Sequence, residues 1–308
     1  MENATYRKRL REYPNLEYCE NIYRHPAVKE EHIVRLKRYC DEALKNGYVD
    51  VDYSTNYDGG RYYTTNTKQL ACCPMSKSVR ATLFGETEYD VDIVNCHFGI
   101  LLFLLEREYH DGGFYDKLYE YINNRERIIE EFNYKDKSKI KSLFPVLLYG
   151  GSVKAWEIEE DIVEGSYTLP PFVNEFKEQM KIITSVLLNN PIFKPIKQKY
   201  YKYKLAEAKE KHDAAQQGKK KKTPFDYEKF NLHDGKYLSA ILHEYERIII
   251  DDVIENVLRE CGIPITAYCY DGFQIRKSDC DEITIEDLID KINDYICVPY
   301  YGRIYFAN

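Results

Sequence analysis

Residues 88–108 read EYDVDIVNCHFGILLFLLERE, and this stretch decides the fold class. Polar and apolar side chains alternate over 88–94, which predicts a strand. A continuous apolar run follows and predicts a helix over 97–108. A strand that runs directly into an apolar helix indicates a mixed α and β protein. The alternation also places Asp90 and Asp92 on the same face of the strand, close to its end.

A second group of strands is predicted near the other end of the chain. The apolar runs 263–270 and 273–276 flank Asp271-Gly272, which is the strongest short hairpin signal in the sequence. A helix over 284–295 and a short strand over 303–306 follow. These strands predict a small antiparallel sheet.

Most of the remaining sequence predicts helices. They are expected over 6–12, 26–46, 114–123, 125–132, 135–148, 172–188 and 236–261. Residues 53–67, rich in Asn, Asp, Thr and Gly, predict a loop. The expected fold class is therefore α+β, with helices covering one face of a small antiparallel sheet. We expect an N-terminal helical region over 1–52 and a second domain over 53–308.

The composition excludes several classes of protein. No apolar run approaches the roughly 18 residues of a membrane-spanning helix, so no membrane partner is expected. The start, Met1-Glu2-Asn3, lacks the basic and apolar segments of a secretion signal. The nine cysteines are an odd number without a CxxC pair, which argues against a disulfide scaffold and a zinc ribbon. We expect a soluble, intracellular protein with reduced thiols.

Positive charge is concentrated in one segment, although the net charge is −7. Residues 194–222 contain eleven lysines and three acids. Such a segment can hold a nucleic-acid backbone through its phosphates. The alternative is a solvated lysine-rich insertion, over about 194–230, that has no partner. Within it, Gln216-Gln217-Gly218 is the predicted flexible spot.

Two aspartates are expected at strand ends. Asp92 ends the strand that precedes the apolar helix, and Asp271 lies at the tip of the predicted hairpin. Two such carboxylates can share a pair of Mg²⁺ ions, which prefer hard oxygen ligands. Metals roughly 4 Å apart stabilise both the attacking and the leaving oxygen in phosphoryl transfer. An Asp-Gly turn by itself is usually only a turn, so the two aspartates indicate a metal site only if a third element of the sequence accompanies them.

The third element is a helix face. Lys137, Lys141, Pro145 and Tyr149 recur every four residues and lie along one side of the predicted helix. The rise from Lys137 to Tyr149 is about 18 Å, enough for two ammonium groups to hold a triphosphate while a ring lies at the base end. The alternative is a lysine face on a surface helix. Pro145 should kink this helix, and Gly150-Gly151 should end it.

Together these motifs resemble family A DNA polymerases and phage-type single-subunit RNA polymerases, and they are most similar to the transposon–virus polymerase (TV-Pol) group. The matching segments are Asp92-Ile-Val-Asn-Cys-His97 for motif A, Lys137-x3-Lys141-x7-Tyr149-Gly150 for motif B, and Tyr270-Asp271 for motif C. Gly60-Arg61-Tyr62-Tyr63 is similar to a Gly-Arg-x-Tyr element of the RNA polymerase branch. The resemblance runs from about 59 to 276. It implies a right-hand palm, helical fingers over about 114–190, and a thumb that is reduced or absent.

The resemblance implies a role for each matching residue. Asp92 and Asp271 would bind two Mg²⁺ ions, with Mn²⁺ as an alternative. Lys141 would contact the incoming triphosphate and protonate the leaving pyrophosphate. The substrate-binding positions would be Lys137, Tyr149 and Gly150, with Arg61 and Arg80 as weaker candidates for template or primer phosphate.

Two residues of motif A have alternative interpretations. His97 stands where these polymerases sense the sugar, so its ring would block a 2′-hydroxyl; otherwise it packs or caps at the helix start. RNA polymerases resembling this chain have glycine at that position. Asn95 fits an N-cap of the following helix better than a substrate contact.

The chain departs from the family pattern at four positions. Lys137 replaces an arginine, Pro145 replaces a large apolar residue, Tyr270 replaces a histidine, and Gly272 replaces an acid. At position 137 lysine supplies positive charge but not the bidentate hydrogen bonding of an arginine guanidinium.

The expected function is template-directed nucleotidyl transfer by a minimal DNA polymerase of a virus or mobile element, with a DNA primer–template and dNTPs as partners. The short chain predicts low processivity, or help from a helicase, primase or processivity partner. One alternative is a single-subunit RNA polymerase or primase. Another is an inactive polymerase-like module that binds nucleic acid. A metal nuclease would also need paired aspartates but has no use for the lysine–tyrosine helix.

Overall fold

Strand β4 (Glu88–Ile93) and helix α4 (Cys96–Glu108) form where the opening stretch predicts them. The predicted alternation is confirmed over 90–93, where Val91 and Ile93 are buried and the two aspartates are partly exposed, but not at the start of the strand, where Glu88 is buried and Tyr89 is partly exposed. The computed structural model describes residues 6–109, 112–163, 165–217, 223–297 and 306–307.

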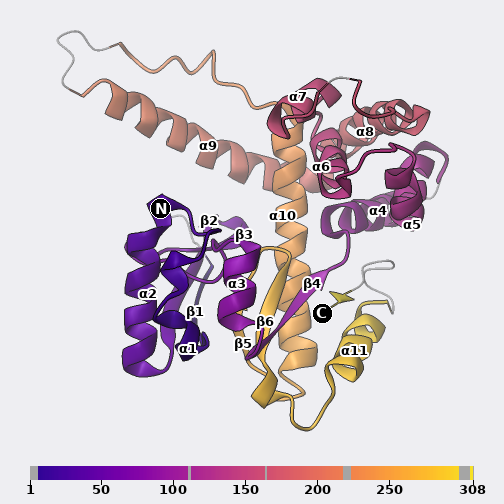
Figure 1. Cartoon of the computed structure of the whole chain (residues 1–308). Helices are drawn as coiled ribbons and strands as arrows, with labels where there is room; N and C mark the ends of the chain where they lie inside the picture. The colour runs from indigo at the N-terminus through magenta and orange to yellow at the C-terminus, as the bar shows by residue number, and fades with distance from the viewer. Residues whose placement is uncertain (1–5, 110–111, 164, 218–222, 298–305, 308) are drawn as a thin grey trace. The chain divides into compact units, whose positions relative to one another are not determined.

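β4 lies inside a four-stranded antiparallel sheet of order β5-β6-β4-β7 (Figure 1). Its other strands are β5 (Ile265–Tyr268), β6 (Gly272–Arg276) and β7 (Phe306–Ala307). The predicted hairpin is thus confirmed as β5–β6. Of the strand predicted over 303–306, only Phe306 lies within the described residues.

A three-stranded antiparallel sheet was not predicted. It consists of β1 (Arg7–Glu12), β2 (Val49–Tyr57) and β3 (Gly59–Thr64). The predicted helix over 6–12 and the predicted loop over 53–67 are therefore wrong, and the region 1–52 contains strand residues as well as helices. Every second residue of β2 is buried, and these residues are valine, tyrosine and threonine, which favour strands. The pairing of β1 with β2, between residues 37 to 47 positions apart, then outweighs the local sequence of β1.

The other predicted helices are confirmed, with shifted ends. The α-helices are α1 (Leu16–Cys19), α2 (Ile33–Asn46), α3 (Lys77–Phe84), α5 (Asp116–Glu130), α6 (Lys137–Leu148), α7 (Val153–Glu159), α8 (Pro171–Asn189), α9 (Lys194–Ala215), α10 (Asp234–Val253) and α11 (Ile285–Cys297). Of these, α1, α3, α7 and α9 were not predicted. The two helices predicted on either side of Asn124 form one element, α5, with non-helical backbone at that residue (φ −126°, ψ 25°). α10 ends earlier than predicted and continues into a π-helical turn, Ile254–Leu258. The protein is of the α+β class.

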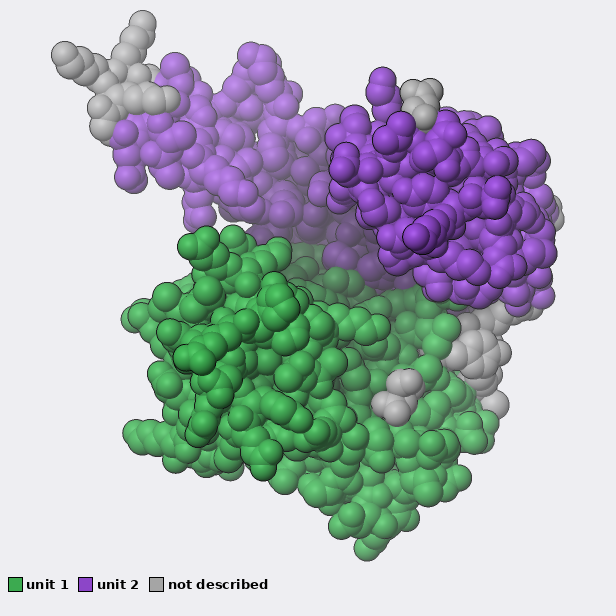
Figure 2. Space-filling view, in the orientation of Figure 1, with its two compact units in different colours: residues 1–96, 244–308 green, residues 97–243 purple. Residues whose placement is uncertain are grey.

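The chain divides into two compact units (Figure 2). Unit 1 comprises residues 1–96 and 244–308, and unit 2 comprises residues 97–243. This division does not follow the predicted boundary at residue 52, because the first sheet is built from both sides of it. Both sheets belong to unit 1, and α5 to α9 belong to unit 2. Among the helices the structure describes, none is long and apolar enough to cross a membrane.

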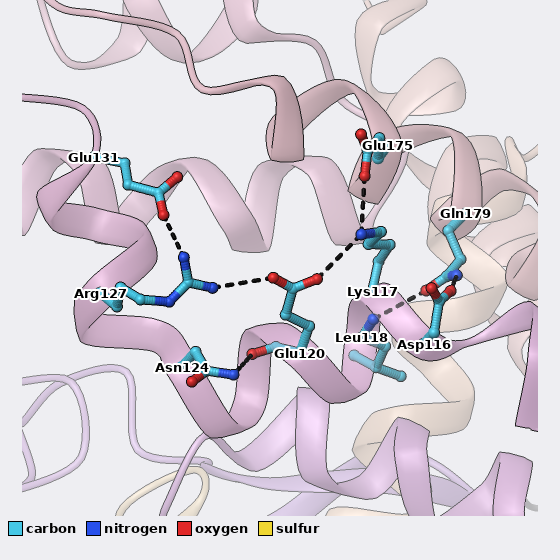
Figure 3. Close-up of polar contacts among 9 residues, drawn as sticks. All are labelled: Asp116, Lys117, Leu118, Glu120, Asn124, Arg127, Glu131, Glu175 and Gln179. Carbon is cyan, nitrogen blue, oxygen red and sulfur yellow. Dashed lines mark hydrogen bonds and ion pairs between the residues drawn. The ribbon is translucent and has the colours of Figure 1, made fainter.

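Unit 2 packs α5, α6 and α8 around an aromatic core. Tyr121 stacks on Phe144 with ring centroids 4.2 Å apart, and Phe176 lies 5.5 Å from Phe144. Polar contacts tie α5 to α8: the Gln179 side chain accepts a hydrogen bond from the Leu118 amide at 2.9 Å (Figure 3). The amide group of Gln179 also donates to Asp116.

The single tryptophan of the chain fixes α7 against α6. Trp156 is fully buried, and its indole N–H donates to the Lys139 carbonyl at 2.8 Å. The Tyr167 ring packs edge-on against it, with the ring centroids 5.4 Å apart. The start of α6, which carries the two candidate lysines, is therefore held by a buried side chain.

Candidate active site

In unit 1, the β4–β6 ladder brings the two predicted metal ligands to the same end of the sheet. Asp92 lies opposite Gly272, the residue after Asp271. A Cβ atom built on Gly272 would lie 2.3 Å from Asp92 Oδ1 and 2.2 Å from the Val91 carbonyl oxygen. The Asp92 carboxylate thus occupies the space that a side chain at 272 would need. This contact leaves room only for glycine at position 272.

The hairpin tip is fixed to the end of β4 by backbone hydrogen bonds. The Cys269 amide donates to the Gly272 carbonyl at 2.9 Å across the turn at the hairpin tip. The central residues of this turn are Tyr270 and Asp271, one position earlier than an Asp-Gly turn predicts, and Tyr270 adopts a left-handed φ of 61°. The Ile93 amide then donates to the Asp271 carbonyl at 3.0 Å. Asp271 is therefore held next to Asp92.

Negative charge accumulates at this end of the sheet. Burial, together with the carboxylates of Asp90 and Asp271, raises the pKa of Asp92 to about 7. Arg80 of α3 offsets part of this charge and forms an ion pair with Asp90 at 3.4 Å. The predicted phosphate-binding candidate Arg80 is thus engaged with a carboxylate.

These carboxylates fit a divalent cation. Asp90 Oδ1 is buried and has no hydrogen-bond partner among the residues described. Asp92 and Asp271 supply the hard oxygen donors that Mg²⁺ and Mn²⁺ prefer. A cation would also favour the ionised form of Asp92, which burial and its acidic neighbours disfavour.

Arg61, another predicted phosphate-binding candidate, is also engaged within unit 1. Its guanidinium pairs with Glu246 of α10 at 2.5 Å, and Glu246 is fully buried. The same guanidinium lies over the Tyr270 ring, 5.1 Å from its centroid. Arg61 therefore supports the hairpin tip that carries Asp271. Glu246 was missed in the sequence, although it lies four residues after Leu242 on the apolar side of the predicted helix.

In unit 2, the two predicted lysines lie on α6 and pair with acids of α5. Lys137 Nζ lies 2.9 Å from Glu130, and Lys141 Nζ lies 2.9 Å from Glu126. All four side chains are well exposed, and ion pairs of this kind contribute little to stability. The lysines can therefore exchange these acids for phosphate at small cost. α6 continues through the exposed Pro145 to Leu148.

The structure brings His97 and Tyr149 together. Tyr149, the C-cap of α6, has its hydroxyl 2.6 Å from His97 Nδ1 near the start of α4. Gly150 follows with a left-handed φ of 81°, which ends the helix as predicted. Asn95 directly precedes α4, where an N-cap is expected, but with a left-handed φ of 49°.

A cavity of about 550 Å³ lies beside Tyr149 and Gly150 in unit 2. Lys177, Met180 and His233 also line it. Two of its lining residues are held by a close backbone approach, since a Cβ atom on Gly235 would lie 2.0 Å from the Tyr149 carbonyl oxygen. The cavity offers cationic and apolar surface next to the predicted base-contacting tyrosine.

Comparison with protein-family models, with curated proteins and with solved structures gave no match to this chain.

Proposed function

We propose that the protein is a template-directed DNA polymerase that transfers deoxynucleotides by phosphoryl transfer, on a right-hand palm formed by the β5-β6-β4-β7 sheet. The observation that carries the proposal is the pairing of Asp92 with Gly272, which sets Asp92 and Asp271 side by side at one end of an antiparallel sheet. The raised pKa of Asp92 supports the proposal, because carboxylates with shifted pKa values are concentrated at functional sites.

In unit 1, Asp92 and Asp271 would hold the divalent cations, with Asp90 as an additional acid on the same strand face. Bound there, the cations supply the positive charge that stabilises the attacking and leaving oxygens. Arg80 limits the repulsion among the carboxylates before substrate arrives. Arg61 and buried Glu246 keep the hairpin tip in place.

In unit 2, Lys137 and Lys141 would bind the triphosphate after release from Glu130 and Glu126. Lys141 would carry a proton on Nζ and deliver it to the departing pyrophosphate. Tyr149 would present its ring to the base of the incoming nucleotide, and His97, bonded to the Tyr149 hydroxyl, would meet the sugar. The adjoining cavity gives room for a base.

Primer extension tests this function. The protein is incubated with a primer–template, Mg²⁺ and either dNTPs or rNTPs, beside Asp92→Asn, Asp271→Asn and the surface control Asp281→Asn. We expect extension with dNTPs, a loss of about 10²-fold to 10³-fold in both site variants, and wild-type rates for the control. Both site substitutions keep the side-chain volume.

Each other outcome contradicts the proposal in a recognisable way. Extension with rNTPs alone indicates an RNA polymerase or primase. Shortening of the primer indicates a nuclease. Binding of the primer–template without extension by the wild type indicates an inactive module.

A further inference from the structure

A groove in unit 2 combines three lysines with two tyrosines. It lies between α8, α9 and the start of α10 and has a volume of about 630 Å³. The residues that α9 contributes are Lys194, Lys197, Gln198, Tyr201 and Lys202. The last four follow Lys194 by three, four, seven and eight positions, and this spacing places all five residues on one face of the helix.

α9 is an unusual helix for a folded unit. None of its 22 residues, all of which the structure describes, is buried. The helix projects away from the other helices of unit 2 (Figure 1). Part of its support is local, since Glu207 pairs with Lys204 at 2.7 Å and with Lys211 at 2.5 Å. A long exposed helix with several tyrosines on its surface is typical of a surface that binds a partner.

The charge of the groove favours a polyanion. Lys194 and Lys202 are exposed, and neither has an ion-pair partner within the part of the chain that the structure describes. They are separated by about 12 Å along the helix. Lys197 is anchored at the groove wall, where its ammonium donates to the Leu188 carbonyl. Asp234 is the one acid among the groove residues.

The aromatic side chains favour a polyanion that carries bases. Tyr201 of α9 and Tyr237 of α10 both line the groove and are partly exposed. Each ring already packs edge-on against another ring, Tyr201 on Phe230 and Tyr237 on Tyr200, which holds its orientation. Ordered rings flanked by lysines are the features with which proteins stack bases while holding the backbone. Asn189 and Gln198 add polar groups that can meet base edges.

We propose that this groove binds single-stranded nucleic acid, with Lys194 and Lys202 on phosphates and Tyr201 and Tyr237 stacking on bases. The strand would be the unpaired part of a template if the protein is a polymerase, so the inference extends the proposed function. The binding itself rests on the groove alone. It needs neither the carboxylates of unit 1 nor a metal ion.

The test is fluorescence anisotropy with a labelled oligo-dT, in EDTA and without nucleotides, over a range of salt concentrations. The first comparison is between two double variants of α9 that each remove two positive charges. Lys194→Gln/Lys202→Gln changes the groove, and Lys204→Gln/Lys211→Gln changes lysines already paired with Glu207. We expect the groove variant to reduce the salt-dependence slope by about 1.4, at roughly 0.7 per lost phosphate contact, and the control to leave it unchanged. Equal changes in both would overturn the proposal, since they indicate diffuse attraction to a charged helix.

The second comparison concerns the rings. Tyr201→Leu and Tyr237→Leu should each weaken binding about tenfold, whereas Tyr201→Phe and Tyr237→Phe should bind as the wild type does. Circular dichroism confirms that each variant is folded. Leucine variants that bind oligo-dT as tightly as the wild type would contradict base stacking. Polyglutamate that displaces the labelled oligo-dT as effectively as unlabelled oligo-dT does would also contradict it, because it would show a surface for anions in general. A duplex of the same length should bind more weakly, because its bases are already stacked.

Failure of this inference is separable from failure of the proposed function. Oligo-dT binding that follows these variants, in a protein without primer extension, supports the groove and rejects the polymerase. Primer extension with wild-type efficiency in Lys194→Gln/Lys202→Gln, together with unaltered oligo-dT affinity, rejects the groove alone.

Discussion

Gly272 is the residue at which the carboxylate site has least room. An added methyl group would meet Asp92 Oδ1 and the Val91 carbonyl oxygen at distances no Cβ atom tolerates. We predict that Gly272→Ala abolishes primer extension, because the Asp92 carboxylate must move. The same overpacking should lower the free energy of unfolding by about 1–3 kcal/mol, measured by chemical denaturation.

Gly262→Ala is the matched control for that variant. Gly262 has a left-handed φ of 69°, so alanine is strained there, but no described atom lies within 4 Å of the added carbon. The control should lose stability and keep its primer extension per folded molecule. Equal loss of activity in both variants would show that extension follows stability and not the position of Asp92.

His97 tests the choice of sugar. Its ring is fixed by the Tyr149 hydroxyl at 2.6 Å, so it cannot turn aside without breaking that bond. We predict that His97→Gly raises incorporation of ribonucleotides relative to deoxynucleotides by about a hundredfold, equivalent to about 2.7 kcal/mol of transition-state free energy. Single-nucleotide incorporation with dNTP and rNTP measures this ratio.

Tyr149→Phe separates the two roles of His97. It removes the hydroxyl and leaves both rings. If the His97 ring excludes the 2′-hydroxyl by its size, the preference for deoxynucleotides should therefore fall less than in His97→Gly. If His97→Gly abolishes incorporation of both sugars, His97 serves the packing of α4 against α6, and the sugar-sensing role is wrong.

At the scale of elements, the Gln179 side chain makes a buried polar contact between α5 and α8. Gln179 accepts from the Leu118 amide and donates to Asp116, and its side chain is nearly buried (Figure 3). We predict that Gln179→Leu lowers the free energy of unfolding by about 1–3 kcal/mol, because a buried amide loses its acceptor. Urea denaturation measures the change. Lys181→Leu, on the exposed side of the same helix, should change stability by less than about 0.5 kcal/mol.

The β1–β2 pair contains a carboxyl group that makes folding depend on pH. Glu12 is fully buried between the Tyr53 hydroxyl and the Cys72 amide, and burial raises its pKa from 4.5 to about 7. Between these values the unfolded chain has released the proton and the folded protein has kept it. Stability therefore falls as pH rises from 4.5 to 7, by on the order of 3 kcal/mol, and levels off above.

Glu12→Gln should remove this dependence. Glutamine resembles the protonated acid, since its oxygen can accept from Cys72 while its amide donates to Tyr53. We predict that the variant is at least as stable as the wild type at pH 8 and that its stability changes less between pH 5 and pH 7. Urea denaturation at the two ends of this range gives the comparison. A variant that is less stable at pH 8 would show that the ionised carboxylate is favourable.

The elements show what local sequence can and cannot predict. The strand 88–94, the hairpin around Asp271 and the helix carrying Lys137 and Lys141 have strong local periodicity, and all three form. β1 has no local strand signal, because its five charged residues and Leu10 form a strand only through pairing with β2. The same limit applies to the site: motif spacing predicts Asp92 beside Asp271, whereas the Arg61–Glu246 pair joins positions 185 apart in sequence.

At the scale of the whole molecule, the two units differ in how their contacts are distributed along the chain. Unit 2 is one continuous segment of helices, and unit 1 is formed by two segments on either side of it. The β4–β6 ladder pairs residues 92 and 272, which are 180 positions apart. Helices with local contacts fold faster than sheets that join distant segments, since long loops are costly to close.

We therefore predict that unit 2 folds before the β5-β6-β4-β7 sheet is complete. Pulsed hydrogen exchange during refolding should protect amides of α5 and α8 earlier than those of β4 and β6. Simultaneous protection in both units would contradict this order and indicate one cooperative folding step.

Trp156 gives the protein a built-in optical reporter. Because it is the one indole of the chain and is buried against α6, tryptophan emission originates entirely from unit 2. Its wavelength should shift to the red when α7 leaves α6 and the ring meets water. Unit 1 contributes only tyrosine emission, so selective excitation of the indole follows one half of the molecule without labelling. A fluorescence-detected melting curve would thus describe the helical unit, and circular dichroism in the amide region would describe both.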